Sequence, residues 1–192
     1  MKTVEIIGFK RANLTKSQLS TLRYDGSIPA VLYGGGLNIQ FHAPAALFKD
    51  LIYTPEAKFV KLNIEGTEYK AIKQEIQFHP VNDMVMHVDF LLLEDGKEVK
   101  MNIPVALKGT ASGVLKGGKL VQRLKHVIVK AMPKNMPELI ELDVTNLEVG
   151  KAIRVSDIET KNFSVLKTAA TPIAAVEMTR AMKEVAPADA KK

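Results

Sequence analysis

Short alternating segments separated by turn residues run along almost the whole chain, and they constrain its fold more than any other feature. KFVKLNI (58–64) alternates apolar and polar residues, a Glu-Gly pair turns it into TEYKAIKQEIQF (67–78), and HPVND (79–83) leads into MVMHVDFLLL (84–93). A period of two residues is typical of half-buried strands. Many strands with few helices favour a closed or nearly closed barrel, because closure removes exposed strand edges.

Two short helices are predicted between the strands of the first half. Thr15 stands three residues before Gln18, which is the spacing of a capping box, and Gly26 lies where a helix C-terminal cap is expected. In APAALFKDLIYTP (43–55), Pro44 suits a first helical turn. The Leu, Phe and Ile residues after it recur at helical spacing, so a second helix is expected there.

The second half of the chain has the same strand-rich pattern but a different charge. Residues 1–95 hold 10 Lys and Arg against 11 Asp and Glu, whereas residues 96–192 hold 17 against 10. Asp95-Gly96 is a strong turn or linker signal, so we place a domain boundary at about residue 95. Strand-like segments continue through 96–180, and the small and charged residues of 181–192 predict a disordered tail.

Composition narrows the class of protein. The chain has no Cys, which excludes disulfides and thiolate metal sites and suits a reducing compartment. No stretch approaches the roughly 20 apolar residues of a membrane span, and MKTVEIIGFKRAN at the N-terminus has no signal cleavage site, so we expect a soluble cytoplasmic protein. The net charge of +6 favours an acidic partner, of which nucleic acid is the commonest.

The stretch IPAVLYGGG (28–36) ends a predicted strand on Tyr33, directly before three glycines. A tyrosine at a strand end, beside bare backbone, can offer its ring to a ligand outside the protein. Lys16 and Arg23 are seven residues apart, which on a helix is about 20° short of two full turns, so they share one face. Together with Arg11 just before the helix, these residues predict an exposed basic and aromatic surface; the alternative is an ordinary solvated helix face.

The stretch HVDF (87–90) is the second candidate site. Alternation along a strand sends Val88 and Phe90 to the core and leaves His87 and Asp89 together on the other face. Three interpretations stay open: a surface pair, a pair presented to a ligand, or a metal site with His79 as an extra ligand. The spacing matches no standard metal motif, and no nucleophile-elbow pattern occurs in the chain.

The stretch GVLKGGK (113–119) matches the G-x-x-x-x-G-K part of a phosphate-binding loop. Leu120 stands where such a loop needs Ser or Thr, and a strand rather than a helix is predicted after it, so nucleotide binding is not expected. A flexible basic loop is the simpler interpretation. Residues 97–134 nevertheless hold nine basic residues and one acid, which suggests docking on a polyanion through phosphate contacts by Lys116, Lys119, Arg123 and Lys125.

Two of these stretches resemble a known family. LRYDGSIPAVLYGG (22–35) and HPVNDMVMHVDF (79–90) are similar to the signature regions of the bacterial large-subunit ribosomal protein twenty-five family, which binds 5S ribosomal RNA. Residues 103–144 resemble the extra domain of its long form, the general stress protein Ctc type, and the likeness covers about residues 1–180. It implies a six-stranded β-barrel with short helices, similar to the anticodon-binding barrels of glutaminyl-tRNA synthetase, followed by a mostly-β domain.

The resemblance also implies a function and a site. We expect a structural constituent of the large ribosomal subunit, with 5S RNA and the subunit as partners and with no catalysis, cofactor, metal or small-molecule substrate. Two alternatives stay open: a general RNA chaperone acting through the basic second half, and a small metal-assisted hydrolase built on His79, His87 and Asp89. Family members often carry Arg where this chain has Ser20 and Thr21, so its helix is less basic. The RNA-contacting positions implied by the resemblance are Arg11, Lys16, Arg23, Tyr33, His87 and Asp89.

Overall fold

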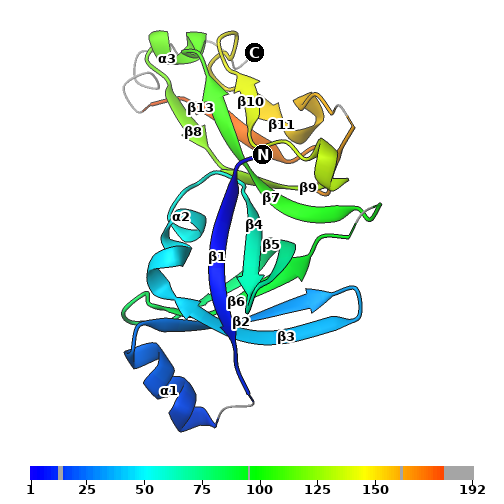
Figure 1. The fold of residues 1–192 in the computed structure, drawn as a ribbon. Coiled ribbons are helices and arrows are strands. Elements are labelled where there is room, and N and C mark those ends of the chain that lie inside the picture. The colour runs from blue at the N-terminus through cyan, green and yellow to red at the C-terminus, as the bar shows by residue number, and fades with distance from the viewer. Residues whose placement is uncertain (13–14, 95, 161, 180–192) are drawn as a thin grey trace, which may run out of the picture. The chain divides into compact units, whose positions relative to one another are not determined.

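The computed structural model describes residues 1–12, 15–94, 96–160 and 162–179, and the chain forms two compact units (Figure 1). The first unit comprises residues 1–101 with 131–138, and the second comprises residues 102–130 with the described residues from 139 onward. Asp95 of the predicted turn and the predicted tail, residues 181–192, lie outside the described residues. No helix within the described ranges is long and apolar enough to cross a membrane.

A closed six-stranded barrel makes up most of the first unit, as expected from the sequence. Its strands follow one another around the barrel in the order β1-β3-β2-β6-β5-β4, and β4 pairs with β1 to close it. The pairs β1–β4 and β2–β6 are parallel, and the other pairs are antiparallel. The strands are β1 (Thr3–Lys10), β2 (Ser27–Gly34), β3 (Leu37–Pro44), β4 (Phe59–Ile64), β5 (Thr67–Phe78) and β6 (Val85–Leu92).

Alternate residues of each strand fill the barrel. The rings of Phe41, Phe48 and Phe90 are fully buried at its centre, where Phe90 lies 5.9 Å from Phe41 and 6.3 Å from Phe48 between centroids. Gly8 of β1 allows this packing, because a Cβ added there would lie 2.5 Å from Cδ2 of Phe41. Since inward and outward residues alternate along a strand, every second side chain lies on the outside of the barrel.

The predicted first helix is α1 (Lys16–Tyr24), and its capping signals are confirmed. The Thr15 backbone N–H donates to Oε1 of Gln18 at 2.9 Å, and Gly26 has the positive φ of +76° that follows many helix ends. The predicted second helix is a shorter pair, η1 (Ala45–Phe48) and α2 (Lys49–Ile52). The placement of Pro44 in its first turn was wrong: with ψ 134° this residue is extended and ends β3.

The second unit is also mostly β, and its strands form two small sheets. The first sheet has the order β10-β7-β9-β12 and the second β11-β13-β8. A cluster of Ala111, Val144, Leu147 and Val176 packs in its core. Its elements are β7 (Val99–Lys108), which begins in the first unit, α3 (Ser112–Leu115), β8 (Lys119–Gln122), β9 (His126–Ala131), β10 (Ile140–Asp143), β11 (Ala152–Arg154), η3 (Val155–Asp157), β12 (Ser164–Val165) and β13 (Pro172–Glu177). The short helix η2 (Pro133–Asn135), after β9, belongs to the first unit.

The segment LVQRLKHVIVKA (120–131), predicted as one strand, is divided between β8 and β9 in different sheets. The division has a visible cause. The backbone N–H groups of Arg123 and Leu124 both donate to the Ile173 carbonyl, at 2.8 and 3.1 Å, and the Gln122 side chain donates to the carbonyls of Val105 and Leu124. These bonds hold the chain in a bend that periodicity alone does not reveal.

Candidate nucleic-acid interface

The outward residues of β3, β2, β6 and β5 form one continuous surface, which we call the barrel face. In β6, Val88 and Phe90 are fully buried, so His87 and Asp89 point outward, as the alternation predicted. The barrel face comprises Gln40 and His42 of β3; Pro29, Val31 and Tyr33 of β2; His87, Asp89 and Leu91 of β6; and Glu75 and Gln77 of β5.

His87 and Asp89 form a direct pair on the barrel face. Nδ1 of His87 lies 2.6 Å from Oδ1 of Asp89, and both side chains are partly exposed. Because the Nδ1 hydrogen is donated to the carboxylate, a neutral His87 ring presents Nε2 as an acceptor, and a protonated ring presents a donor there. The pair therefore offers a ligand one oriented imidazole nitrogen together with the carboxylate oxygens that remain.

Tyr33 lies at the end of β2, and three glycines follow it in the hairpin to β3. Its side chain is half-buried; this burial, followed by the charges of Asp89 and Glu75, raises the pKa of the Tyr33 hydroxyl above its ordinary value. The phenol is neutral near pH 7, as an ordinary tyrosine is, and can both donate and accept. A Cβ added at Gly34 would lie 3.3 Å from the backbone nitrogen of Leu92. This hairpin therefore lies close against β6.

Arg11 and Arg23 lie close to each other beside these strands. Nε of Arg23 donates to the Met86 carbonyl at 3.1 Å, and the Arg11 backbone N–H donates to the Gln40 carbonyl at 3.0 Å. Burial, and then the charge of Arg23, lower the pKa of Arg11. Two neighbouring guanidinium groups repel each other, and a bound anion would relieve that repulsion.

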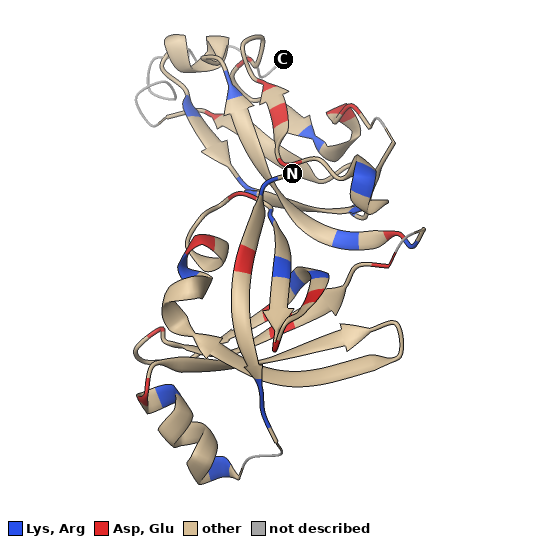
Figure 2. Ribbon diagram, in the orientation of Figure 1, with Lys and Arg blue, Asp and Glu red and all other residues tan. Residues whose placement is uncertain are grey.

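Lys16 does not join this group. It is exposed in the first turn of α1, and Figure 2 shows the two basic positions of this helix at its opposite ends. Seven residues of helix separate Lys16 from Arg23 by about 10 Å along the axis. The structure therefore brings five of the six predicted positions to the barrel face or its border and leaves Lys16 at the far end of α1.

Sequence reasoning missed four polar members of the barrel face: Gln40, His42, Glu75 and Gln77. Alternation within LNIQFHAP (37–44) could have placed Gln40 and His42 on one side of a strand. It could not have shown that this strand is the neighbour of β2. Glu75 pairs with Asp89 across a register shift between Lys73 and Glu75, which no periodic pattern indicates.

The residues considered for a metal site do not assemble into one. Within the described part of the chain, no three His, Cys, Asp or Glu side chains lie close enough together to hold a metal ion. His79, the third ligand of that hypothesis, lies in the turn after β5, where its Nδ1 accepts from the Val81 backbone N–H at 3.3 Å. The metal-assisted hydrolase thus lacks its ligand set among these residues.

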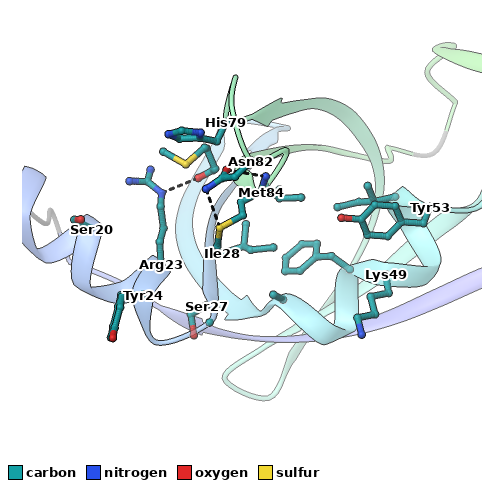
Figure 3. Close-up of a pocket in the computed structure, with 16 residues that line it drawn as sticks. Ser20, Arg23, Tyr24, Ser27, Ile28, Lys49, Tyr53, His79, Asn82 and Met84 are labelled. Carbon is teal, nitrogen blue, oxygen red and sulfur yellow. Dashed lines mark hydrogen bonds between the residues drawn. The ribbon is translucent and has the colours of Figure 1, made fainter.

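A cavity of about 480 Å³ opens at one end of the barrel (Figure 3). It lies between the end of α1, the η1–α2 segment and the turn from β5 to β6. Ile28 and Phe48 line its apolar part, and Arg23, Tyr24 and Tyr53 lie around it. Arg23 is the predicted RNA-contacting residue among those that line this cavity, and neither His87 nor Asp89 lines it, so the cavity borders the barrel face and is separate from the His87–Asp89 pair.

Comparison with known proteins covers both units. Residues 6–90 match the ribosomal L25p family, and residues 98–180 match ribosomal protein TL5, C-terminal domain. The large ribosomal subunit protein bL25 of Cytophaga hutchinsonii is 51% identical over the full length of both chains. The proteins of the same name from Amoebophilus asiaticus and Porphyromonas gingivalis are 50% and 40% identical, over 95% and 97% of this chain and 93% and 98% of their own.

The chain belongs to the bL25 family of large ribosomal subunit proteins. The match to the TL5 C-terminal domain confirms the long, two-domain type that the resemblance implied. In this bL25 chain the second unit holds the basic residues predicted to dock on a polyanion. Lys116, Lys119 and Lys125 are exposed, whereas Nη2 of Arg123 forms an ion pair with Oε1 of Glu177 at 2.9 Å.

The predicted flexible basic loop is held at both ends by packed glycines, while Leu115, Lys116 and Gly117 between them are exposed. Gly113 is buried, its N–H donates to the Leu147 carbonyl at 2.9 Å, and its carbonyl accepts from the Gly118 N–H at 2.9 Å. A Cβ at Gly113 would lie 2.7 Å from the backbone nitrogen of Val149. The glycines of the G-x-x-x-x-G-K pattern thus serve packing, and their backbone groups are not turned toward a phosphate.

Proposed function

We propose that this chain is a structural constituent of the large ribosomal subunit that binds 5S ribosomal RNA through the barrel face of its first domain, residues 1–95. The single observation that carries the proposal is the gathering of Arg11, Arg23, Tyr33, His87 and Asp89 at one surface, although they come from four separate parts of the chain. The names of the relatives support the ribosomal part of the proposal.

Each side chain has a part that its chemistry suits. Arg11 and Arg23 bind phosphates and set the position of the RNA, and Lys16 reaches a more distant phosphate from the far end of α1. Tyr33 offers a ring for stacking and a neutral hydroxyl. His87 presents Nε2 to a base edge or a 2′-hydroxyl.

Asp89 indicates what kind of RNA fits. A carboxylate is repelled by phosphate, so Asp89 serves by orienting His87 and by accepting a hydrogen bond from a base amino group. Regular A-form RNA keeps its base edges in a deep, narrow major groove. The barrel face therefore suits an irregular RNA helix whose groove is widened, and this requirement is the source of specificity for one RNA.

A competition experiment tests the proposal. Labelled 5S RNA bound to the full chain is challenged with unlabelled 5S RNA or with an equal mass of unrelated RNA, and only the 5S competitor should displace it. His87→Ala should weaken binding without lowering the melting temperature, because Val88 and Phe90 carry the core side of the strand. His126→Ala is the matched control, since His126 is an exposed strand residue of the second unit.

The same experiment separates the alternative function. A general RNA chaperone acting through the basic second domain would be displaced equally by both competitors, and His87→Ala would then leave its binding unchanged. A large fall in the melting temperature of His87→Ala would make His87 a packing residue instead.

A second RNA contact is proposed for the second domain, residues 96–180. Lys116, Lys119, Arg123 and Lys125 would dock it on neighbouring ribosomal RNA by phosphate contacts without sequence readout. The exposed positions of the three lysines favour this contact, while the Arg123–Glu177 ion pair must open before Arg123 can take part. Such a protein works on the ribosome in the cytoplasm, and we propose no catalytic step, cofactor or small-molecule substrate for it.

A further inference from the structure

The barrel face continues onto β1, where Phe9 points outward. Ile6 and the backbone at Gly8 face the core, and alternation places Ile7 and Phe9 on the outside. Phe9 is 53% exposed, far more than a phenylalanine in a core strand. An exposed aromatic ring beside a candidate RNA-binding surface is available for stacking, and burying it against a ligand would be favourable.

The ring of Phe9 lies against a member of the barrel face. Phe9 and His42 are register partners across β1 and β3, and their ring centroids are 5.8 Å apart with planes tilted by 35°. His42 pairs on its other side with Pro29 of β2. Because Ala30 pairs with Val88 in the parallel β2–β6 pair, the preceding outward positions, Pro29 and His87, also lie side by side.

A row of neighbouring positions therefore crosses four strands, from Phe9 through His42 and Pro29 to His87. Pro29 is buried, so the flat rings that this row leaves at least partly exposed are those of Phe9, His42 and His87. The row joins Phe9 to the His87–Asp89 pair without a break in the register. Flat rings on the outside of a sheet are the means by which proteins stack the bases of single-stranded or unpaired RNA.

Polar groups beside this row lack partners. Nε of Arg11 and Nδ1 of His42 are buried, and neither has a hydrogen-bond partner among the residues that the structure describes. Arg11 follows Phe9 by two residues and lies on the same side of the chain. Leaving buried donors or acceptors unpaired is costly, so these groups suit a surface that is completed by a ligand. An exposed ring with a cation two residues away matches a nucleotide, which has a flat base and a charged phosphate.

We infer that Phe9 stacks on an unpaired base of the RNA that binds the barrel face, with Arg11 on the adjoining phosphate and His42 holding the Phe9 ring in position. This inference rests on the proposed function, because it extends the same surface to a fifth strand, β1. It adds an aromatic contact on β1 that neither the family matches nor the sequence motifs assign.

Fluorescence gives a direct test, because the chain contains no Trp. The F9W variant carries a single indole at the stacking position, and saturating 5S RNA should strongly quench its fluorescence. The I7W variant is the matched control: Ile7 is 51% exposed on the same strand and the same side, but it lies beyond the residues of β1 that pair with β3. Its fluorescence should change much less.

Affinity measurements complete the test. F9A should weaken binding of the full chain to 5S RNA by about 5- to 150-fold, the range for loss of one stacked base. I7A should leave the affinity within about twofold, as an exposed substitution away from the site does. F9W should bind about as tightly as the wild type, which shows that the ring is needed rather than this particular residue.

The outcomes separate the inference from the function on which it rests. If the wild type prefers 5S RNA but F9A binds it equally well, or if F9W fluorescence does not respond to it, the stacking inference is wrong and the proposed function stands. If F9A weakens retention on the large subunit and not binding to isolated 5S RNA, Phe9 contacts another constituent and the inference is also wrong. If the wild type shows no preference for 5S RNA, both fail together.

Discussion

Tyr33 illustrates how the fold assigns a single side chain to binding. The strand that carries it puts Leu32 into the core, with no exposed surface, and turns the Tyr33 ring outward beside Asp89. A tyrosine hydroxyl is neutral at pH 7 in any case, and burial and the two nearby carboxylates raise the pKa of Tyr33 further, so it also stays neutral in more alkaline solution. Ring and hydroxyl are therefore both available at neutral pH, and substitutions can separate their contributions.

We expect Tyr33→Ala to weaken binding to 5S RNA by about 1–3 kcal/mol, the cost of removing one stacked base, and Tyr33→Phe to cost much less. Dissociation constants at one fixed salt concentration measure the difference. If Phe is as damaging as Ala, the hydroxyl rather than the ring makes the contact. Both variants should melt at the wild-type temperature, since the core face of β2 is unchanged.

Gly8 gives a prediction about stability at the same scale. A methyl group at this position would overlap the fully buried Phe41 ring, which has no room to move away. Gly8→Ala should therefore lower the free energy of unfolding by about 1–3 kcal/mol, as overpacking does in other cores. Chemical denaturation measures the change. Ile7→Ala, on the exposed side of the same strand, serves as the control, and an equal loss in both variants would argue against overlap with Phe41.

At the scale of secondary-structure elements, local hydrogen bonds decide where short segments begin and end. The Gln18 side chain caps the start of α1, and the Asp157 carboxylate caps the start of η3. Asp157 accepts from the Arg154 backbone N–H and from the Ser156 hydroxyl, both at 2.9 Å, and these bonds lower the pKa of Asp157. A charged acceptor makes the stronger bond, so the stability it supplies depends on pH.

We expect Asp157→Asn to lower the melting temperature at neutral pH. The difference in melting temperature between the variant and the wild type should become smaller as the pH falls. The folded pKa of Asp157 is lower than the unfolded value, so its stabilisation is present above the unfolded pKa, about 3.9, and is lost as the pH falls through the folded pKa. Melting curves of both proteins between neutral pH and strong acid measure this convergence. A difference that stays constant over the whole range would exclude the carboxylate charge as its cause.

At the scale of the whole molecule, the fold redistributes the charge that the sequence concentrates. Among the described residues, Lys97, Lys108 and Arg123 of the basic stretch 97–134 form ion pairs with acids outside that stretch. The pairs are Lys97–Glu94, Lys108–Glu141 and Arg123–Glu177, at 2.6, 3.9 and 2.9 Å. The basic excess available to a polyanion is therefore smaller than the local count, and exposed lysines such as Lys119 make up part of it.

Replacing Lys116, Lys119, Arg123 and Lys125 together with Gln should make the chain dissociate from the large subunit at lower salt, while binding to isolated 5S RNA stays largely intact. Removing one phosphate-binding cation should flatten the log–log salt dependence of binding by about 0.7–0.9. Retention on purified subunits across a salt series measures the slope. The control variant replaces Lys2 and Lys61 with Gln. These lysines pair with Glu56 and Glu68, so their loss should leave the slope unchanged. Identical slopes for the quadruple variant and the wild type would refute docking through phosphates.

The sequence alone determined the features that depend on near neighbours. Alternation showed that His87 and Asp89 share a face, the Thr15–Gln18 spacing showed where α1 begins, and the density of strands predicted a barrel. These features follow from the chain's own geometry, because a side chain's direction repeats every two residues in a strand and a helix end is capped within one turn.

Only the tertiary structure decided which distant segments become neighbours. It paired β2 with β6 in parallel, brought Arg23 to the Met86 carbonyl 63 residues away and placed His42 against Phe9. It also divided residues 120–131 between two sheets. Periodicity tells which side of a strand a residue occupies but not which strand lies beside it, since many pairings would bury the same apolar faces. The partner is chosen by closure of the barrel and by packing of its core, and these depend on the whole chain at once.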